Sequence, residues 1–404
     1  MDLSGPALIL DRLAIDEGKH LALIAAAQFD PDGEPVRIEL ERLELSWPEA
    51  QPWIDPILSS AGYPGLLLDG AAKLSGTWLP GGWQLGEAAL SDLSVTDPQG
   101  RVEVSGLTLA AHLGDTAPAS KLHWESLKMF GLPVSAGQFD WQWQPQRLAQ
   151  LGETRVALLG GTLGLSGLTR VSGRWQGSLA IDQLDFAALS ERFGWPAFGG
   201  QISANLANFD LHDGQIDLPG EILVRAFDGE IGIKNLATER LLGDSPALAA
   251  DVRMNDLDLS QVTAAMSFGE IQGRMDGYIN GLRLLDWSPI AFDARLQSER
   301  KAGVKQRISR RAVEGLSRIG GAGLNNALVG LVDSFGYADL GIACRLKEDV
   351  CAMDGVDSDG RGYTIVKGSG IPRLTVNGYQ RKVDWPVMVR RLKAAASGSG
   401  PIID

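Results

Sequence analysis

The feature that most constrains the fold is a unit that occurs twice along the chain. Asp185 aligns without a gap with Asp258, 73 residues later, and Gly200 then aligns with Gly273. In each copy an aspartate suited to cap a helix precedes a short amphipathic segment, and glycine-punctuated β-type sequence follows. The second copy, Asp258–Gln297, ends in a clean alternation of apolar and polar residues. Each copy therefore predicts one short helix that leads into a run of strands.

A looser third copy starts near Trp53 and passes through Gly70 and Gly76. Small helix-and-strand units repeated along a chain are typical of an elongated repeat architecture rather than of one globule. The alternative is chance similarity, because glycine- and leucine-rich β sequences align with one another easily.

Most of the expected strands have one apolar and one polar face. Residues 138–144 place Phe139, Trp141 and Trp143 on one side and only polar residues on the other. The same alternation recurs in 36–45, 102–109, 202–211, 220–234, 248–254 and 290–296. This pattern predicts a mainly antiparallel sheet with water on one face only. Where the alternation slips, at Arg42, Gly106 and Asn208, we expect β-bulges.

The sequence contains too few expected helices to cover so much apolar sheet. The uncovered face must meet another sheet, curl on itself or bind an apolar ligand. We predict a mainly β fold, an elongated, curled antiparallel sheet whose apolar face lines a groove; a closed β-sandwich built on the same residues is the alternative. The predicted groove residues are Val102, Val104, Phe139, Trp141, Trp143, Ile202, Leu206, Leu248, Val252, Met254, Ile271, Met275, Ile290, Phe292 and Leu296.

Charge is unevenly distributed along the chain. Residues 1–298 hold 20 basic and 39 acidic residues, whereas 299–404 hold 17 basic and 11 acidic. An acidic body argues against nucleic acid as a partner, because binding phosphate needs a basic surface. The basic end suits anionic lipid head groups or an acidic partner, and solvated helices would explain it equally well.

The only two cysteines, Cys344 and Cys351, lie in one expected β-hairpin. With a turn at Lys347–Glu348 they would face each other across the two strands, close enough for a disulfide bond. A disulfide would indicate an oxidising compartment. The alternative is a pair of buried thiols, and zinc is unsupported because no histidine lies nearby.

The last hundred residues show a different sequence pattern, because helical spacing alternates with short expected strands. Helical spacing predicts one helix over 299–318 and a second from Leu324 through Leu328 and Leu331 to Phe335. Strands are expected at 363–367 and 374–379, and Asp384 is placed to cap a final basic helix. We divide the chain into a β-groove segment (1–184), a repeated helix-plus-strands module (185–298), a C-terminal cap (299–393) and a flexible tail (394–404).

Three stretches of this C-terminal region carry a family resemblance: KQRISRRAVEGLSRIGG (305–321), FGYADLGIACRLKEDVCAMDG (335–355) and GYTIVKGSGIPRLTVNGYQRKVDW (362–385). They resemble the end of YdbH-type proteins, which are AsmA-like, bridge-like lipid transfer proteins of Gram-negative bacteria and also carry the label dicarboxylate transport. The module at 185–298 resembles the unit that closes many AsmA-like chains. Before residue 185 the resemblance is one of pattern alone.

The resemblance implies a curled sheet that spans the periplasm, with phospholipid acyl chains in the groove and head groups in water. It further implies an N-terminal anchor in the inner membrane, and a small outer-membrane lipoprotein that joins by strand addition. The first residues show no signal peptide, and no run of about 20 apolar residues predicts a transmembrane helix. We therefore expect this chain to be the outer-membrane-proximal part of a longer protein.

Residue patterns of catalysis are not found. The four histidines are scattered, and the sequence has no phosphate-binding loop and no nucleophile elbow. We therefore expect a non-enzymatic protein with no cofactor and no metal. Two other interpretations stay open: an assembly factor that templates outer-membrane proteins by strand addition, and a carbohydrate-active enzyme that uses an acidic pair such as Asp256 and Asp258.

Overall fold

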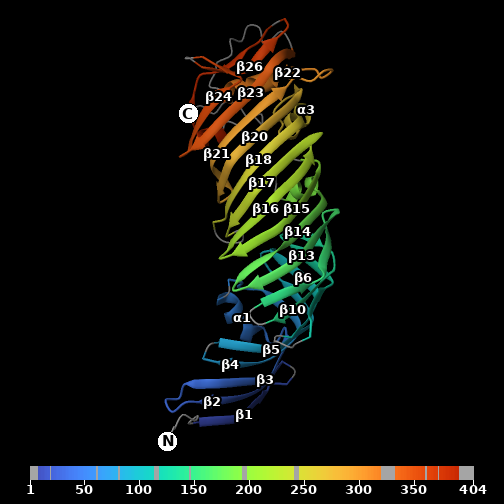
Figure 1. Ribbon diagram of the computed structural model, residues 1–404, viewed down its shortest axis with the longest axis vertical. Coiled ribbons are helices and arrows are strands. Elements are labelled where there is room, and N and C mark those ends of the chain that lie inside the picture. The colour runs from blue at the N-terminus through green and yellow to red at the C-terminus, as the bar shows by residue number, and fades with distance from the viewer. Residues whose placement is uncertain are drawn as a thin grey trace. The chain divides into compact units, whose positions relative to one another are not determined.

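The computed structural model describes most of the chain, which divides into two compact units, Met1–Ala180 and Ile181–Asp404 (Figure 1). The described residues are 8–18, 20–60, 62–80, 82–112, 118–144, 147–192, 198–240, 245–319, 333–359, 362–371 and 373–390.

In the first unit the strands pair antiparallel with their neighbours in the sheet, which are not always consecutive in the chain, and β14 continues across the boundary into the second unit. They are β1 (Leu8–Asp16), β2 (Leu21–Phe29), β3 (Pro35–Trp47), β4 (Leu67–Leu79), β5 (Gly82–Thr96), β6 (Val102–His112), β7 (Ser120–Trp124), β8 (Ser126–Met129), β9 (Leu132–Val134), β10 (Gly137–Gln144), β11 (Arg147–Leu151), β12 (Glu153–Leu158), β13 (Gly161–Val171) and β14 (Arg174–Asp185). The helix α1 (Gln51–Ser60) lies between β3 and β4, where the looser third copy of the repeat starts.

The second unit continues with β15 (Gln201–His212), β16 (Gln215–Ala226), β17 (Gly229–Glu239), β18 (Ala247–Asp258), β19 (Ile271–Gln272), β20 (Arg274–Leu285), β21 (Ser288–Glu299), β22 (Arg307–Ser309), β23 (Ser334–Lys347), β24 (Val350–Gly355), β25 (Asp357–Ser358), β26 (Tyr363–Ser369), β27 (Val376–Gly378) and β28 (Lys382–Asp384). Its helices are α2 (Phe186–Arg192), α3 (Leu259–Ala265) and α4 (Arg310–Ile319), and residues 385–390 are also helical.

Neighbouring strands within each unit pair antiparallel. In the second unit β15, β16, β17, β18, β20, β21 and β23 form one continuous ladder (Figure 1). The prediction of a mainly β protein, with antiparallel sheet and a few short helices, is confirmed. Alternating sequence forms antiparallel sheet because one face can remain in contact with water.

β-Bulges occur at all three places where the alternation slips. The register shifts in β3 next to Arg42, in β6 at Gly106 and in β15 around Asn208. Gly106 and Asn208 have φ angles of 61° and 59°. A left-handed residue in the extra position is a standard way to insert one residue into a strand while its neighbours keep their faces.

The two copies of the repeat contain the same elements at equivalent positions. β14 and β18, α2 and α3, β15 and β20, and β16 and β21 have matching bounds, each pair separated by the same number of residues. The first turn of each helix is capped in the same way: Asp185 Oδ1 accepts hydrogen bonds from two backbone N–H groups of α2, and Asp258 Oδ1 does so in α3.

A glycine closes each of these helical connections. Gly200 O accepts a hydrogen bond from Phe186 N, and Gly273 O accepts one from Leu259 N. Gly200 and Gly273 have φ angles of 137° and 143°, and Gly70 in the looser third copy has 131°. This region of φ favours glycine, and a Cβ on Gly200 would lie 2.2 Å from a backbone oxygen. The repeat therefore depends on a backbone position that other residues do not fit.

The second unit contains a closed hydrophobic core beside the ladder. Val313 of α4, Tyr337 of β23, and Tyr363 and Ile365 of β26 are almost completely buried in it. In the first unit the buried cluster is smaller and is centred on Leu45, Trp47, Ala50, Ala72 and Leu93.

Two expectations for the C-terminal region need correction. The helix predicted over 299–318 begins only at Arg310, because residues 307–309 form β22 and pair with β19 and β23. Of the second predicted helix, Leu324, Leu328 and Leu331 lie outside the described residues, and Phe335 belongs to β23. The predicted cap at Asp384 is present: its Oδ1 accepts a hydrogen bond from Val387 N at 3.0 Å.

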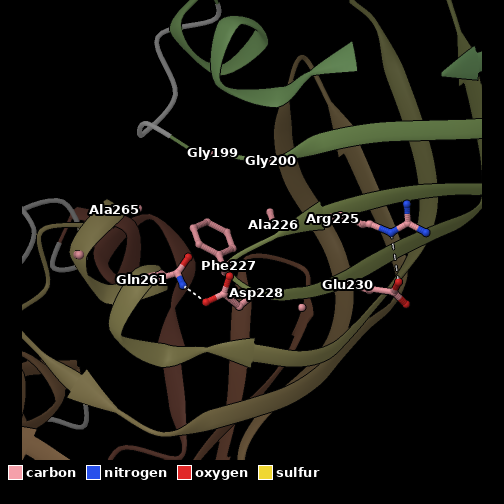
Figure 2. Close-up of a pocket in the computed structure, with 11 residues that line it drawn as sticks. Gly199, Gly200, Arg225, Ala226, Phe227, Asp228, Glu230, Gln261 and Ala265 are labelled. Carbon is pink, nitrogen blue, oxygen red and sulfur yellow. Dashed lines mark hydrogen bonds and ion pairs between the residues drawn. The ribbon is translucent and has the colours of Figure 1, made fainter. Parts of the chain in front are cut away.

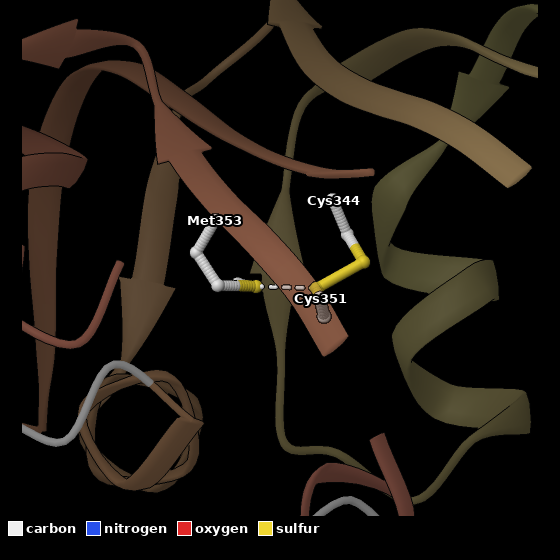
Figure 3. The surroundings of a disulfide bond; sticks show 3 residues. All are labelled: Cys344, Cys351 and Met353. Atoms are coloured by element: carbon white, nitrogen blue, oxygen red, sulfur yellow. Dashed lines mark hydrogen bonds between the residues drawn. A yellow bond between two sulfur atoms is a disulfide. The ribbon is translucent and has the colours of Figure 1, made fainter. Parts of the chain in front are cut away.

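Cys344 and Cys351 form a disulfide bond with their Cα atoms 5.5 Å apart (Figure 3). The predicted turn is wrong by one residue, because Glu348 and Asp349, with φ angles of 50° and 57°, form it. In this register Cys344 pairs with Met353 and Cys351 with Leu346, so the bond is diagonal. A two-residue turn with both φ angles positive matches the twist of a hairpin.

Replacing both cysteines with alanine should destabilise the second unit. Because the bridge closes a short loop, the expected loss is roughly 2.5 kcal/mol in the free energy of unfolding. Chemical denaturation of the variant and of the oxidised and reduced native protein measures it. The reduced protein should match the variant, and an unchanged midpoint in both would contradict the prediction.

Candidate functional site

The register of the second unit aligns apolar side chains in rows that cross the strands. Directly paired residues lie on the same face, with Cβ atoms about 5 Å apart. The first row consists of Ile202, Val224, Ile231, Met254, Gly277, Leu296 and Ile342, one residue from each successive strand.

Two further rows run parallel to the first. The second consists of Ala204, Ile222, Ile233, Val252, Ile279, Ala294 and Cys344. The third consists of Leu211, Ile216, Thr238, Leu248, Leu284 and Pro289. Thr238 is the one residue in the three rows with a polar side chain. We call these three rows the apolar track.

Bulges keep the three rows on one face. In β15, β16, β17 and β20 the register shifts between the second and the third row. Asn208, Gly220, Asn235 and Gly281 occupy these positions with positive φ angles. Each bulge adds one residue to its strand, so the later side chains keep their face although their numbering has shifted by one. β18, which lies between β17 and β20, has no extra residue at this level. Bulges also bend strands, so their alignment curves the sheet along the track.

The first unit has rows of the same kind. One consists of Leu21, Leu45, Ala72, Leu90, Leu109, Leu122 and Phe139. Another consists of Leu68, Val95, Val104, Leu127, Val134 and Leu158. Apolar rows that cross the strands are therefore a property of both units.

The opposite face of the second unit carries paired charges. Lys234 lies 3.5 Å from Glu221 on the neighbouring strand, and Arg345 lies 2.8 Å from Asp293. Ion pairs as exposed as these contribute little to stability. They do show that this face is the one adapted to water.

The track is only partly buried. Ile222, Ile233 and Val252 of the second row are of intermediate exposure. In the first row Ile202 and Val224 are buried, and Ile231, Met254, Leu296 and Ile342 pack against the closed core. The main contacts of β15, β16 and β17 are with their ladder neighbours, and those of β18 are with its neighbours and α3. A side chain that rests on its own sheet with its outer side uncovered has this intermediate exposure, and it leaves room for an apolar ligand.

Seven of the predicted groove residues belong to these rows: Val104, Phe139, Ile202, Leu248, Val252, Met254 and Leu296. Four others pair across strands outside the rows: Val102 with Met129, Trp141 with Gln150, Trp143 with Leu148, and Phe292 with Leu346. Phe292 also packs edge-to-face against Trp385, which follows β28, at 5.2 Å between ring centres.

The remaining four lie elsewhere. Ile271 and Met275 are 3% and 5% exposed and belong to the closed core. Leu206 is fully buried beside the bulge of β15, and Ile290 lies at a bulge of β21 and is 43% exposed. Apolar alternation is the same in a strand that a helix covers and in one that it leaves open, so the pattern did not separate these positions.

Several central track residues were not singled out from the sequence. Ile222, Ile231, Ile233 and Ile279 lie in the middle of the second unit's rows. Their alternation was visible, but their membership of a row follows from the register of pairing, which one strand's sequence does not contain.

Helix α3 and the turn between β16 and β17 form one rim of the track. Hydrogen bonds from Arg274 and Lys301 lower the pKa of Asp256 to about 2. Arg274 Nε lies 2.7 Å from Asp256 Oδ1, and Lys301 Nζ lies 2.6 Å from the same oxygen. Asp256 is thus held by two cations, and Asp258 caps α3, so both members of the acidic pair have structural partners.

An open pocket of about 730 Å³ lies at this rim, between Gly199–Gly200, the segment Arg225–Glu230 and α3 (Figure 2). Gln261 donates a hydrogen bond to Asp228 across it, and Arg225 lies 3.5 Å from Glu230. These polar groups pair with one another, which is typical of a structural rim.

Among the described residues, no helix combines the length and the apolar character needed to cross a membrane. The same residues contain no group of three or more histidine, cysteine or acidic side chains positioned to hold a metal ion.

No protein-family model matches the chain, and no curated protein or solved structure matches it either. The function of the apolar track must therefore be argued from its own geometry.

Truncating matched isoleucines should distinguish the track from the core. Ile365→Ala removes buried methyl groups from a closed core and should lower the free energy of unfolding by about 2–5 kcal/mol. Ile233→Ala, on the half-covered track, should cost roughly 1 kcal/mol because less area leaves water there. Urea denaturation measures both, and equal losses would show that Ile233 is packed as tightly as a core residue.

Proposed function

We propose that this protein is a non-enzymatic carrier of phospholipids whose acyl chains lie on the apolar track while the head groups remain in water. The observation that carries the proposal is the set of three parallel apolar rows, which continue from strand to strand and in which most residues, including the whole second row, stay half-exposed. A closed sandwich would bury such residues completely, as the second unit does in its core.

The energetics suit a bound lipid. Covering roughly 400 Å² of apolar surface at about 25 cal/mol/Å² contributes on the order of 10 kcal/mol before the cost of ordering the lipid. Adjacent strands are about 4.8 Å apart. Because each strand presents similar aliphatic side chains, a lipid meets similar energy at each step and can move along the rows without a high barrier.

The disulfide between Cys344 and Cys351 supports an oxidising compartment. We therefore place the protein in the periplasm, as the outer-membrane-proximal part of a YdbH-type bridge between the two membranes. A small outer-membrane lipoprotein would add a strand to the ladder. Among the described strands β28 pairs only with β24, and its second edge is our proposed position for that partner.

An arginine on the track should remove bound lipid. Val252→Arg places a charge in the middle of the second row, where desolvation beside acyl chains is unfavourable; we expect at least a fivefold loss of co-purified phospholipid. Asn255→Arg adds the same side chain to the same strand on its exposed side and should leave the lipid content unchanged. Mass spectrometry of extracted lipid measures both.

Native protein that carries no phospholipid when purified from membranes in mild conditions would contradict the proposal. A photoreactive residue at Ile233 addresses the main alternative. It should label lipid; labelling of an outer-membrane protein instead would favour a factor that assembles such proteins by strand addition.

A further inference from the structure

The two rims of the second unit's track differ in structure. At one rim β14 and β18 end, α2 and α3 follow, and β15 and β20 begin. At the other rim the strands are joined by hairpin turns, at 213–214 between β15 and β16, at 286–287 between β20 and β21, and at 348–349 between β23 and β24. Backbone hydrogen bonds link neighbouring turns, from Arg240 N to Gly214 O and from Asp286 N to Pro246 O. We call this second edge the hairpin rim.

At the helical rim Ala226, Leu257 and Leu259 are at most 5% exposed, and the polar groups around the open pocket there pair with one another. The third row of the track lies next to the hairpin rim instead. The head group of a lipid held on that row would therefore lie over the hairpin rim.

Acidic residues dominate the hairpin rim. Asp213, Asp286, Glu348 and Asp349 occupy its turns with φ angles between 47° and 57°, and their side chains are surface groups. Glu239 lies at the end of β17. The basic residues among the described residues at or next to this rim are Arg240, Arg283 and Lys347, and Lys347 lies 3.7 Å from Glu348. The described part of the rim is therefore net negative.

These acidic turns lie close to the track. Leu211 and Leu284 of the third row are each two residues from the turn aspartates Asp213 and Asp286. At about 3.3 Å per residue this places the acids about 7 Å beyond the last apolar side chains. That distance is shorter than the Debye length of about 10 Å at 0.1 M salt, so a head group over the rim interacts with them.

We propose that the hairpin rim selects phospholipids with a zwitterionic, amine-bearing head group over phospholipids with a net anionic one. The inference rests on the proposed function, since it concerns the head group of the lipid that the track would hold. An ammonium group over the rim is attracted to Asp213, Asp286 and Asp349, whereas a head group with net negative charge is repelled. The surplus of acidic residues over 1–298 acts in the same direction.

The test loads the purified protein from vesicles that contain equal amounts of phosphatidylethanolamine and phosphatidylglycerol with identical acyl chains. Bound lipid is quantified by mass spectrometry at low and at high salt. We expect about a fivefold enrichment of phosphatidylethanolamine near 0.05 M salt, and about equal binding near 0.5 M salt, where charges are screened.

A rim variant, Asp213→Asn with Asp286→Asn and Asp349→Asn, should bring the ratio at low salt close to one. Asparagine adopts the left-handed conformation readily, so the turns are retained, and circular dichroism with a thermal melt confirms the fold. The control, Glu221→Gln with Glu230→Gln and Glu299→Gln, changes the net charge equally away from the hairpin rim and should keep the preference.

Each outcome decides a different claim. Bound phospholipid without a head-group preference, enrichment of phosphatidylglycerol, or a preference that the control alone abolishes would overturn the selective rim and leave the carrier function standing. Retention of neither lipid would overturn the carrier function itself.

Discussion

Everything in this structure depends on keeping the apolar side chains of successive antiparallel strands in register. Each strand has one apolar face, and a single strand leaves that face exposed to water. Pairing Val224 with Ile231, and Ile231 with Met254, converts separate faces into a row. Aligned bulges at Asn208, Asn235 and Gly281 then allow the sheet to bend without turning later residues to the other side.

The second unit uses the same kind of strand in two environments. Where α3 and α4 cover the sheet, Ile271 and Met275 are enclosed in a core. Where none of the described helices covers it, Ile233 and Val252 remain half-exposed. The closed part supplies stability, because buried methyl groups are worth most in a well-packed interior. The uncovered part offers half-exposed apolar side chains to a ligand. The proposed carrier function rests on this difference between the covered and the uncovered part of the sheet.

Much of the local structure was predictable because it depends on short-range physics. Asp185 and Asp258 cap helices because their side chains reach backbone N–H groups two and three residues on. The helix over 299–318 was predicted too long, since helical spacing does not reveal that residues 307–309 find strand partners on β19 and β23. The cysteines were paired correctly, but the turn was placed one residue too early.

The sequence by itself determined the class of the fold, the repeat and the presence of an apolar face, because alternation, capping and glycine positions act within a few residues. The tertiary structure alone decided which apolar residues are open. Ile271 and Val252 are equally apolar in sequence, yet Ile271 belongs to the closed core and Val252 does not. It also decided that the acidic turns at Asp213, Asp286 and Asp349 share one rim, because their alignment depends on strand pairing between residues far apart in the chain.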